Sequence, residues 1–475
     1  MLSQDIYKIY CAGNFISTDN NHLVTNPYNN SQVANTFLAS ETELDKAIVA
    51  AENSKQELLS LPSFTRYSVL KQISDELFSL RKQFAELITF ESGKPIRYAL
   101  SEVDRSIQTF LVAAEESKRL PKEYMSIDWT PAGTGKEGIL KYFPIGIVAG
   151  ISPFNFPLNL AVHKIAPAIA AGCPIILKPS SLTPLSTLML AQIIDRTELP
   201  KGAVSILPMD RQTGNKLVTD SRISLLSFTG SPEVGWKMKR DAGNKKVVLE
   251  LGGNAGVIIS HGSDLDTAAA KCVAGGFAYS GQVCIHTQRI YVMTDLFDSF
   301  SKLFVEKTKL LKAGDPLDPS TDMAVMIDEA NAIRVENWVK DAVEGGATLL
   351  AGGKRENSYM PPTVLTGTRE TMQVCAGEVF GPVVVIEAVD SFSEAILRVN
   401  SGRFGLQAGV FTDSINEMNE AFNKLEVGGV IINDVPTFRV DHMPYGGLKD
   451  SGSGREGVKY AILDMMEPRL LVKNC

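Results

Sequence analysis

The chain has 475 residues, of which 44% are hydrophobic, and this predicts two or three folded domains and excludes a largely disordered protein. Lys plus Arg total 47 and Asp plus Glu total 54, so the net charge is -7. A chain with this charge lacks the excess of basic residues that attracts nucleic acid. The first residues, "MLSQDIYKIYCAGNF", lack a signal-peptide core and no run of 18 apolar residues occurs, so we expect a cytoplasmic protein without a membrane partner.

The first part of the chain shows helical periodicity. Apolar residues recur at intervals of three and four in residues 41–61 and 67–92, which predicts two or three amphipathic helices. Residues 120–142 instead contain two half-apolar runs around a Gly- and Pro-rich turn, and this pattern predicts an exposed hairpin.

Between residues 145 and 260, short apolar runs such as "IGIVAGIS" and "SLLSFTGS" alternate with helical stretches such as "NLAVHKIAPAIAAG". This alternation predicts a parallel, doubly wound sheet covered on both faces, with ligands beyond the carboxyl ends of its strands. A similar alternation over residues 262–440 predicts a second α/β domain. The tail, "YAILDMMEPRLLVKN", ends in a strand-like run that would be an exposed edge, so strand pairing between subunits is expected.

The cysteines and histidines do not form the patterns of a disulfide framework or a metal site. Six cysteines occur without CxxC spacing, and the five histidines form no HExxH motif or paired cluster with cysteine. We therefore expect free thiols and no metal. One thiol, Cys284 in "SGQVCIHT", needs a separate explanation.

Six motifs along the chain resemble, in order, those of the NAD(P)-dependent aldehyde dehydrogenase superfamily. The similarity spans nearly the whole sequence, and the six together are far more specific than any one. The motifs are "SPFNFPLNLAVHKIAPAIAAGCPIILKPS", "SLLSFTGSPEVG", "VVLELGGN", "SGQVC", "EVFGPV" and "PYGGLKDSGSGREG".

The resemblance implies an α/β fold of three parts. A Rossmann-type cofactor domain would take residues 1–122 and 142–252, and an α/β catalytic domain residues 253–458. A small β oligomerisation domain would take the hairpin at 123–141 and the C-terminal strand at 459–475. This small β domain would hold the subunits of a homodimer or a homotetramer together.

Three residues match the family's catalytic groups. Cys284 matches the nucleophile. Because the ordinary pKa of a cysteine thiol is about 8.5, a helix dipole or the positive nicotinamide would be needed to favour the thiolate near neutral pH. Glu250, at the end of the strand "KVVLE", matches the base that activates water against the thioester. Asn155, between the prolines of "PFNFP", matches the donor to the oxyanion, with the N–H of Cys284 as the second donor. His286 is interpreted as structural because alternate residues of an extended segment point to opposite faces.

The cofactor-binding interpretation combines local chemistry with the resemblance. Ser231 and Pro232 are typical N-cap and N1 residues of a helix whose N-terminus can receive a phosphate, and Gly230 allows close approach. The usual GxGxxG fingerprint is absent. Ser181 stands where NAD-preferring relatives commonly have Glu, so we expect NADP to be accepted, with NAD as the alternative. The cofactor contacts that the resemblance implies, with Arg211 added by its place in the sequence, are Lys178, Ser181, Arg211, Gly252, Glu378 and Phe380.

The substrate prediction rests on His163, Arg105 and Arg439, which would form a pocket for a short polar aldehyde. Val283 stands before Cys284 where phosphate-handling relatives have Arg, which disfavours a phosphorylated substrate. Lactaldehyde is therefore expected first and succinate semialdehyde second, with phosphorylated or phosphonated aldehydes as a further alternative. An acyl-CoA-forming enzyme, a cofactor-free thiol hydrolase and a non-catalytic scaffold remain as rivals.

Overall fold

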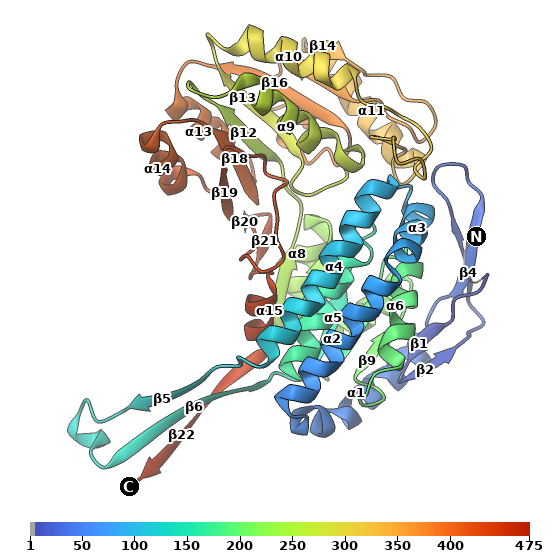
Figure 1. Ribbon diagram of the computed structural model, residues 1–475, viewed down its shortest axis with the longest axis vertical. Helices are drawn as coiled ribbons and strands as arrows, with labels where there is room; N and C mark the ends of the chain where they lie inside the picture. The colour runs from blue at the N-terminus through green and yellow to red at the C-terminus, as the bar shows by residue number, and fades with distance from the viewer. Residues whose placement is uncertain (1–4) are drawn as a thin grey trace.

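The computed structural model describes residues 5–475, so the first four residues of the predicted cofactor-binding segment lie outside the described residues. Two α/β lobes and a projecting arm of three strands make up the molecule (Figure 1). No helix within residues 5–475 combines the length and the apolar character needed to cross a membrane.

The first lobe is built on an eight-stranded sheet with the order β2-β1-β9-β8-β7-β10-β11-β21. Its five central strands run parallel, whereas β1, β2 and β21 pair antiparallel at the two edges. The chain moves outward from β7 to β8 and β9 and then returns to place β10 on the other side of β7. This reversal creates a crevice at the carboxyl ends of β7 and β10, the usual ligand position in such sheets. The strands are β1 (Ile9–Cys11), β2 (Asn14–Ile16), β7 (Ile147–Ile151), β8 (Ile175–Lys178), β9 (Val204–Ile206), β10 (Ile223–Thr229), β11 (Lys246–Glu250) and β21 (Gly452–Ser453).

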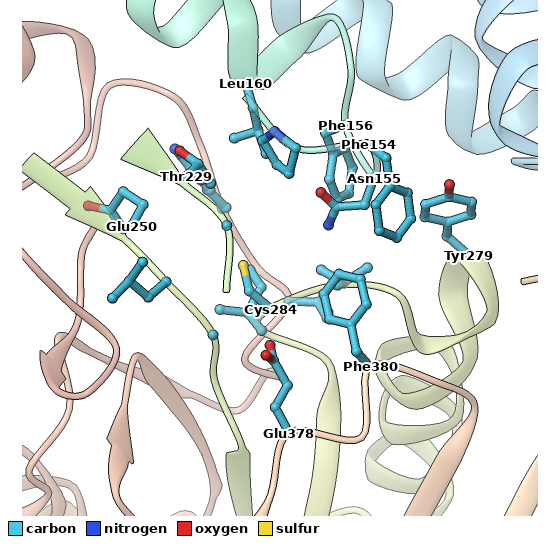
Figure 2. A pocket seen from close by; sticks show the side chains of 18 of the residues that line it. Phe154, Asn155, Phe156, Leu160, Thr229, Glu250, Tyr279, Cys284, Glu378 and Phe380 are labelled. Atoms are coloured by element: carbon cyan, nitrogen blue, oxygen red, sulfur yellow. The ribbon is translucent and has the colours of Figure 1, made fainter. Parts of the chain in front are cut away.

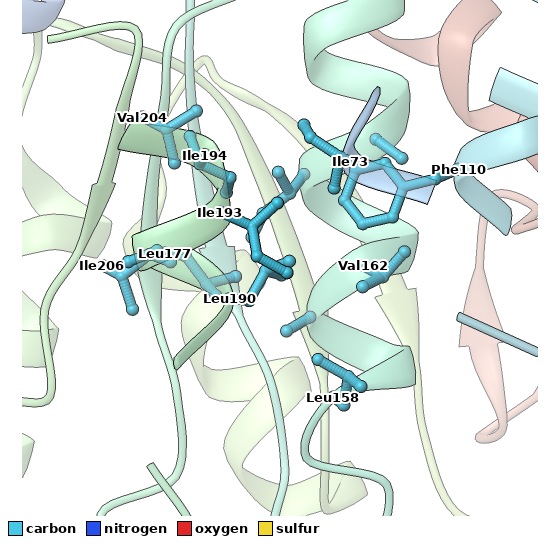
Figure 3. Close-up of a cluster of buried hydrophobic side chains, with 14 of the residues drawn as sticks. Ile73, Phe110, Leu158, Val162, Leu177, Leu190, Ile193, Ile194, Val204 and Ile206 are labelled. Atoms are coloured by element: carbon cyan, nitrogen blue, oxygen red, sulfur yellow. The ribbon is translucent and has the colours of Figure 1, made fainter. Parts of the chain in front are cut away.

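Helices cover both faces of this sheet, which explains why its central strands are apolar throughout. Figure 3 shows one of the two cores, in which Ile73, Phe110 and Val162 from three helices pack near Leu177 and Ile206 of the sheet. A second cluster fills the opposite face. The helices are α1 (Glu41–Ser60), α2 (Ser63–Ser79), α3 (Arg81–Ser92), α4 (Ile96–Ser117), α5 (Asn159–Ala171), α6 (Leu185–Asp195), α7 (Arg211–Thr219) and α8 (Pro232–Asp241).

The second lobe contains a seven-stranded sheet with the order β14-β15-β16-β13-β12-β18-β19, parallel except for the β14–β15 pair. The second α/β alternation predicted from the sequence is thus present. Its strands are β12 (Ala255–Ile259), β13 (Thr287–Met293), β14 (Thr348–Ala351), β15 (Thr363–Thr366), β16 (Val383–Val389), β18 (Gln407–Phe411) and β19 (Gly429–Ile432). Its helices are α9 (Leu265–Phe277), α10 (Phe297–Lys309), α11 (Glu329–Glu344), α12 (Gln373–Ala376), α13 (Phe392–Asn400) and α14 (Ile415–Lys424).

The projecting arm is the three-stranded sheet β22-β6-β5. The predicted hairpin is formed by β5 (Lys122–Ser126) and β6 (Lys136–Pro144), and β22 (Met466–Asn474) pairs along the other side of β6. Figure 1 shows that the arm extends away from both lobes and that β22 ends at the C-terminus. The expected exposed edge strand is therefore present.

The structure differs from the sequence interpretation in three places. α4 was not predicted, although its buried apolar residues Val103, Ile107 and Phe110 recur at intervals of three and four. Before α1, the chain forms β1 and β2 and a separate pair, β3 (Asn21–Thr25) with β4 (Gln32–Phe37). Near the C-terminus, β21 joins the first sheet beside β11, and α15 (Val458–Asp464) packs on α5. The segment before residue 458 thus returns to the first lobe and does not stay with the second.

Candidate active site

A cavity of about 650 Å³ opens at the carboxyl ends of β7, β10 and β11. Its wall combines residues that follow these strands with residues from loops of the second lobe, among them Asn155, Thr229, Glu250, Cys284 and Glu378. Figure 2 shows these side chains gathered around one space, with the sulfur of Cys284 near its centre. The crevice expected from the strand order is therefore also where the predicted catalytic residues meet.

The backbone before Cys284 follows an unusual path. Tyr279, Ser280 and Gly281 have φ angles of 48°, 53° and 67°, so three consecutive residues adopt the left-handed conformation. Such a conformation costs a non-glycine residue roughly 1 to 2 kcal/mol and must be held by its surroundings. The Ser280 hydroxyl donates to the carbonyl of Ala324 at 2.8 Å, within the buried core. This anchored turn directs the following segment, and Cys284 with it, into the cavity.

The Cys284 thiol is half-buried, and its Sγ lies 3.2 Å from the hydroxyl of Tyr445. Burial raises the pKa of the thiol to about 11, with Glu378 and Glu250 adding to the rise, while Tyr445 and Arg439 oppose it. Without a bound cation the group therefore stays protonated at neutral pH. This agrees with the expectation that a helix dipole or a positive nicotinamide is needed to favour the thiolate.

Glu250 ends β11 at the cavity wall and is 3% exposed. Within residues 5–475 neither of its carboxylate oxygens has a hydrogen-bond partner. Burial raises its pKa well above the ordinary value, and the charge of Glu456 adds to this, whereas Arg439 and Lys164 lower it. A carboxylate of this kind is a stronger base than an exposed one, and its unpartnered oxygens can receive a water molecule.

Asn155 lies in the turn between β7 and α5 and is 4% exposed. One N–H of its side-chain amide donates to the carbonyl of Gln282 at 2.9 Å. Since an amide carries two N–H donors, the second remains for a group in the cavity. Figure 2 shows the Asn155 side chain on the side of the cavity opposite Glu250, with Cys284 between them.

The start of α8 fits a phosphate group. Gly230 and Ser231 line the cavity immediately after β10, and Ser231 is the N-cap residue, with Pro232 at N1 as predicted. The Ser231 side chain makes no capping hydrogen bond, so it does not occupy the N-terminus of the helix. The N–H groups and the helix dipole at this point are well suited to the phosphates of a dinucleotide.

Glu378, Gly252 and Phe380 form another wall of the same cavity. Glu378 accepts a hydrogen bond from the N–H of Gly253 at 3.0 Å, and burial raises its pKa to about 7. A Cβ at Gly252 would lie 2.2 Å from Oε2 of Glu378, so only glycine permits this approach. Phe380 has a φ of 45° and packs edge-on against Phe154, with ring centroids 5.8 Å apart.

The other three predicted cofactor residues lie outside this cavity wall. Lys178 ends β8, next to the end of β7, and is close enough to Asp210 and Arg211 for their charges to affect its pKa, which burial lowers. Arg211 begins α7. Ser181 instead lines a second cavity of about 280 Å³, and its carbonyl contacts Nε2 of His22 at 2.7 Å. The structure therefore brings Lys178 and Arg211 together but places Ser181 apart.

Of the predicted substrate residues, Arg105 and Arg439 line the cavity, but His163 does not fit the prediction of a direct aldehyde contact. The His163 ring is 1% exposed, and its Nε2 contacts Asp441 at 2.8 Å and Arg439 at 3.5 Å. His163 is not among the residues that line the cavity. Burial and then the charge of Arg439 lower the pKa of His163, whereas Asp441 and Glu456 raise it. Arg105 also binds Asp441, at 2.7 Å.

A buried charge network behind the site was not predicted from the sequence. The Lys164 ammonium contacts Glu456 at 3.4 Å and the Thr229 hydroxyl at 2.8 Å, and Arg439 donates to Glu456 at 2.8 Å. Tyr445 was also missed as a neighbour of the thiol. One available signal for the charge network was Lys164, a lysine inside the largely apolar stretch "NLAVHKIAPAIAAG".

Comparison with known proteins agrees with this geometry. The model of the "Aldehyde dehydrogenase family" matches residues 15–471. The chain is 41% identical over 469 residues to the 3-sulfolactaldehyde dehydrogenase of Priestia megaterium, covering 98% of each, and 41% identical over 456 residues to the lactaldehyde dehydrogenase of Methanococcus aeolicus, covering 95% and 97%.

Two solved structures are similar over almost the whole chain. Aldehyde dehydrogenase 21 from Physcomitrella patens, in complex with the reaction product succinate, has a TM-score of 0.98 and 45% identity, with 99% of each chain covered. A glyceraldehyde-3-phosphate dehydrogenase from Methanocaldococcus jannaschii, complexed with NADP, has a TM-score of 0.92 and 38% identity, with 96% and 99% covered.

Proposed function

Because the chain belongs to the aldehyde dehydrogenase family, we propose that it oxidises a short polar aldehyde to the carboxylic acid through a thioester on Cys284. One observation carries this proposal. Cys284, Glu250 and Asn155 meet in a single cavity whose wall also holds the two guanidinium groups of Arg105 and Arg439. Nucleophile, base, oxyanion donor and a polar substrate wall therefore occur together.

In the first step, Cys284 as thiolate attacks the aldehyde carbon. The second N–H of the Asn155 amide and the main-chain N–H of Cys284 are assigned to the oxygen that becomes negative. Donors of this kind act most strongly in a site shielded from water. Each is worth roughly a hundred- to a thousandfold in rate in comparable enzymes.

In the last step, Glu250 takes a proton from a water molecule as that water attacks the thioester and releases the acid. Its unpartnered oxygens and raised pKa support this role. The presence of a base favours hydrolysis over transfer to coenzyme A. A cofactor-free thiol hydrolase would also use Cys284, but it would not need a helix N-terminus open to phosphate.

The residues around the cavity fit a nicotinamide dinucleotide. Gly230, Ser231 and the start of α8 would hold its phosphates, Glu378 and Phe380 would position the nicotinamide end, and Lys178 with Arg211 would contact the adenosine end. The bound cofactor supplies the acceptor for the aldehyde hydride. We assign NADP first and NAD second because the cation Arg211 lies near Lys178 and would attract a 2'-phosphate, and a neighbour solved with NADP agrees with this choice.

The polar wall supports a short substrate with a hydroxyl or an anionic group at its far end, lactaldehyde first and succinate semialdehyde second. Arg105 and Arg439 can both approach such a group, and the Nε of Arg439 has no hydrogen-bond partner within residues 5–475. Relatives named for lactaldehyde and sulfolactaldehyde, and a neighbour solved with succinate, agree with this class. A phosphorylated aldehyde is disfavoured because Val283 is apolar at the cavity wall.

We assign the protein to the cytoplasm as a homodimer or homotetramer assembled through the arm. The exposed apolar residues of β22 support assembly, and the six cysteines, none of them in a disulfide within the described chain, suit a reducing compartment.

The proposal is tested by measuring kcat/KM for lactaldehyde, succinate semialdehyde, 3-sulfolactaldehyde, glyceraldehyde 3-phosphate and hexanal with NADP+ and with NAD+. The polar, unphosphorylated aldehydes should exceed hexanal by about tenfold or more, because one charge-assisted hydrogen bond is worth that much. Arg105→Gln should remove this advantage while leaving hexanal oxidation nearly unchanged. Preference for hexanal would contradict the polar pocket.

Cys284→Ala tests the chemistry separately from the substrate. It should abolish oxidation of every aldehyde while leaving cofactor binding intact, whereas the exposed Cys475 should tolerate Cys475→Ala without loss. Retained turnover in the Cys284→Ala protein would refute the covalent mechanism.

A further inference from the structure

The hydroxyl of Tyr445 lies 3.2 Å from the sulfur of Cys284, and neither the catalytic mechanism nor the packing of the site accounts for it. Tyr445 is 3% exposed and packs in a small apolar cluster with Val283, Ile285 and Leu406. A phenylalanine ring would fill the same space. The oxygen is therefore the only polar atom that this side chain adds beside the reacting sulfur.

The ring of Tyr445 is fixed from two sides. Its backbone N–H donates to the carbonyl of Glu456 at 2.9 Å, and the N–H of Glu456 donates back at 2.6 Å. The Arg439 guanidinium lies 3.7 Å from the centre of the ring and donates to the Glu456 carboxylate at 2.8 Å. A cation at this distance from an aromatic face is attracted to it. The hydroxyl is thus held in place before any substrate enters.

The direction of the hydrogen bond depends on the state of the sulfur. A thiol can donate or accept, but a thiolate can only accept, so next to a thiolate the tyrosine must be the donor. Tyr445 keeps its own proton, because burial and the neighbouring sulfur raise its pKa well above the ordinary value. It therefore does not act as the base that removes the proton from Cys284.

The other charged groups facing the sulfur come from three separate segments. Glu250 at the end of β11 and Glu378 before β16 both disfavour the thiolate, whereas Arg439, before Tyr445 in the loop after β19, favours it. Only Tyr445 makes a hydrogen bond to the sulfur among the described residues. Among the described residues, Tyr445 is therefore the direct contact that lowers the pKa of the thiol, against the two carboxylates that raise it.

We propose that Tyr445 is a catalytic residue whose hydroxyl donates a hydrogen bond to the Cys284 thiolate, with Arg439 as the positioning residue that holds its ring. The proposal rests on the proposed function only in taking Cys284 as the nucleophile. The bond increases the fraction of thiolate and fixes the direction in which the sulfur faces the aldehyde.

The test uses full-length protein without cofactor and follows alkylation of Cys284 by iodoacetamide, a neutral reagent, as a function of pH. Peptide mass spectrometry separates Cys284 from the other five cysteines. In Tyr445→Phe the midpoint of the profile should move upward by about one pH unit or more, since a hydrogen bond to a charged group is worth at least that much. Below the midpoint, alkylation should be about tenfold slower.

The matched control is Tyr291→Phe, which removes another buried tyrosine hydroxyl, 3.1 Å from the guanidinium of Arg289 and away from the cavity. Its profile should coincide with the unmodified protein. Replacement of Tyr445 by 3-fluorotyrosine keeps the hydroxyl but makes it a stronger donor, so the midpoint should move downward. This variant keeps the proposal testable if Tyr445→Phe does not fold.

Identical alkylation profiles for the unmodified protein, Tyr445→Phe and the fluorotyrosine protein would overturn the role of Tyr445. A failure of the proposed function gives a different result. If Cys284 were not the nucleophile, the Cys284→Ala protein would keep its aldehyde oxidation, whatever the shape of the pH profile.

Discussion

The side-chain amide of Asn155 donates a hydrogen bond to the carbonyl oxygen of Gln282 at 2.9 Å and so connects the turn after β7 to the loop that carries Cys284. Gln282 is itself fixed, since its side-chain oxygen accepts from the N–H of Ile327 at 2.9 Å. Asn155 therefore has two tasks. One N–H holds the loop of Cys284 in place, and we propose that the other is directed to the oxyanion.

Asn155→Ala should lower kcat/KM by about a hundred- to a thousandfold, because it removes an oxyanion donor. It should also lower the free energy of unfolding by about 1 kcal/mol, the typical value of one buried hydrogen bond. Steady-state kinetics and urea denaturation measure the two effects. The iodoacetamide reaction of Cys284 separates them further: an unchanged alkylation rate with low activity would assign the loss to the oxyanion, and unchanged activity would contradict the assignment.

Glu250→Gln should separate the two halves of the reaction. The amide fills the same space, so thioester formation can proceed, but it cannot take a proton from water. Mixing enzyme, aldehyde and cofactor in a stopped-flow instrument should show a burst of about one reduced nicotinamide per site and then slow turnover. Equal steady-state rates in both proteins would show that another group activates the water.

The pH dependence of turnover and the pH dependence of stability should both reflect the titration of the Glu250 carboxyl group. Its folded-state pKa is raised by burial, so turnover should rise with pH as the carboxylate forms. The stability effect has the opposite sign. A group with a raised folded pKa contributes stability that is present below its unfolded pKa and lost as pH rises through the folded value. Glu250→Gln should therefore raise Tm more at pH 8 than at pH 5, and an equal change at both would contradict this.

Much of the fold could be predicted because local patterns of apolar residues in the sequence indicate its strands and helices. The strands of both parallel sheets are continuous apolar runs, and β11 ends at Glu250 as expected. Two elements were not predicted, for different reasons. α4 carries buried apolar residues at helical spacing, such as Val103, Ile107 and Phe110, so its periodicity was available in the sequence, and only its buried Glu102, which accepts from the N–H groups at the start of α5, departs from it. β21 has only two residues, too few for any periodicity.

The candidate site could be predicted where a motif places a residue directly and could not where the fold brings distant segments together. Cys284, Glu250 and Asn155 each belong to a motif at a strand end or turn. The place of His163 outside the cavity lining could not be predicted, because spacing along a helix gives the direction of a side chain only if the helix orientation is known. Tyr445 is 161 residues from Cys284 in the sequence, and nothing in its motif indicates contact with sulfur.

Glu456→Gln should strongly destabilise the protein. Glu456 is 3% exposed and lies between Lys164 and Arg439, and although burial alone would raise its pKa, these two cations lower it to about 2. Removing its charge leaves two buried cations uncompensated, which typically costs about 3 to 5 kcal/mol. Urea denaturation measures the loss.

The control for this variant is Glu329→Gln. Glu329 also pairs with an arginine, Arg355, at 2.8 Å, but its side chain is 54% exposed. An exposed pair contributes at most about 1 kcal/mol, so this change should be small. Similar losses for the two variants would show that burial does not determine the strength of the network.

The edge strand β22 gives the last prediction. It pairs with β6 on one side, and within residues 5–475 its other side has no partner strand. Leu470, Leu471 and Val472 are 48%, 53% and 48% exposed, and because side chains alternate along a strand, both faces present apolar surface. An uncovered apolar edge favours association with another strand.

In the proposed homo-oligomer a second copy covers this edge of β22, so Leu471→Lys, which places a charge there, should reduce the mass measured by light scattering to that of a smaller assembly or a monomer. Leu310→Lys is the matched control, since Leu310 is 76% exposed but follows α10 in the second lobe, far along the chain from the arm. It should leave the mass unchanged, and an unchanged mass in Leu471→Lys would place the subunit interface elsewhere.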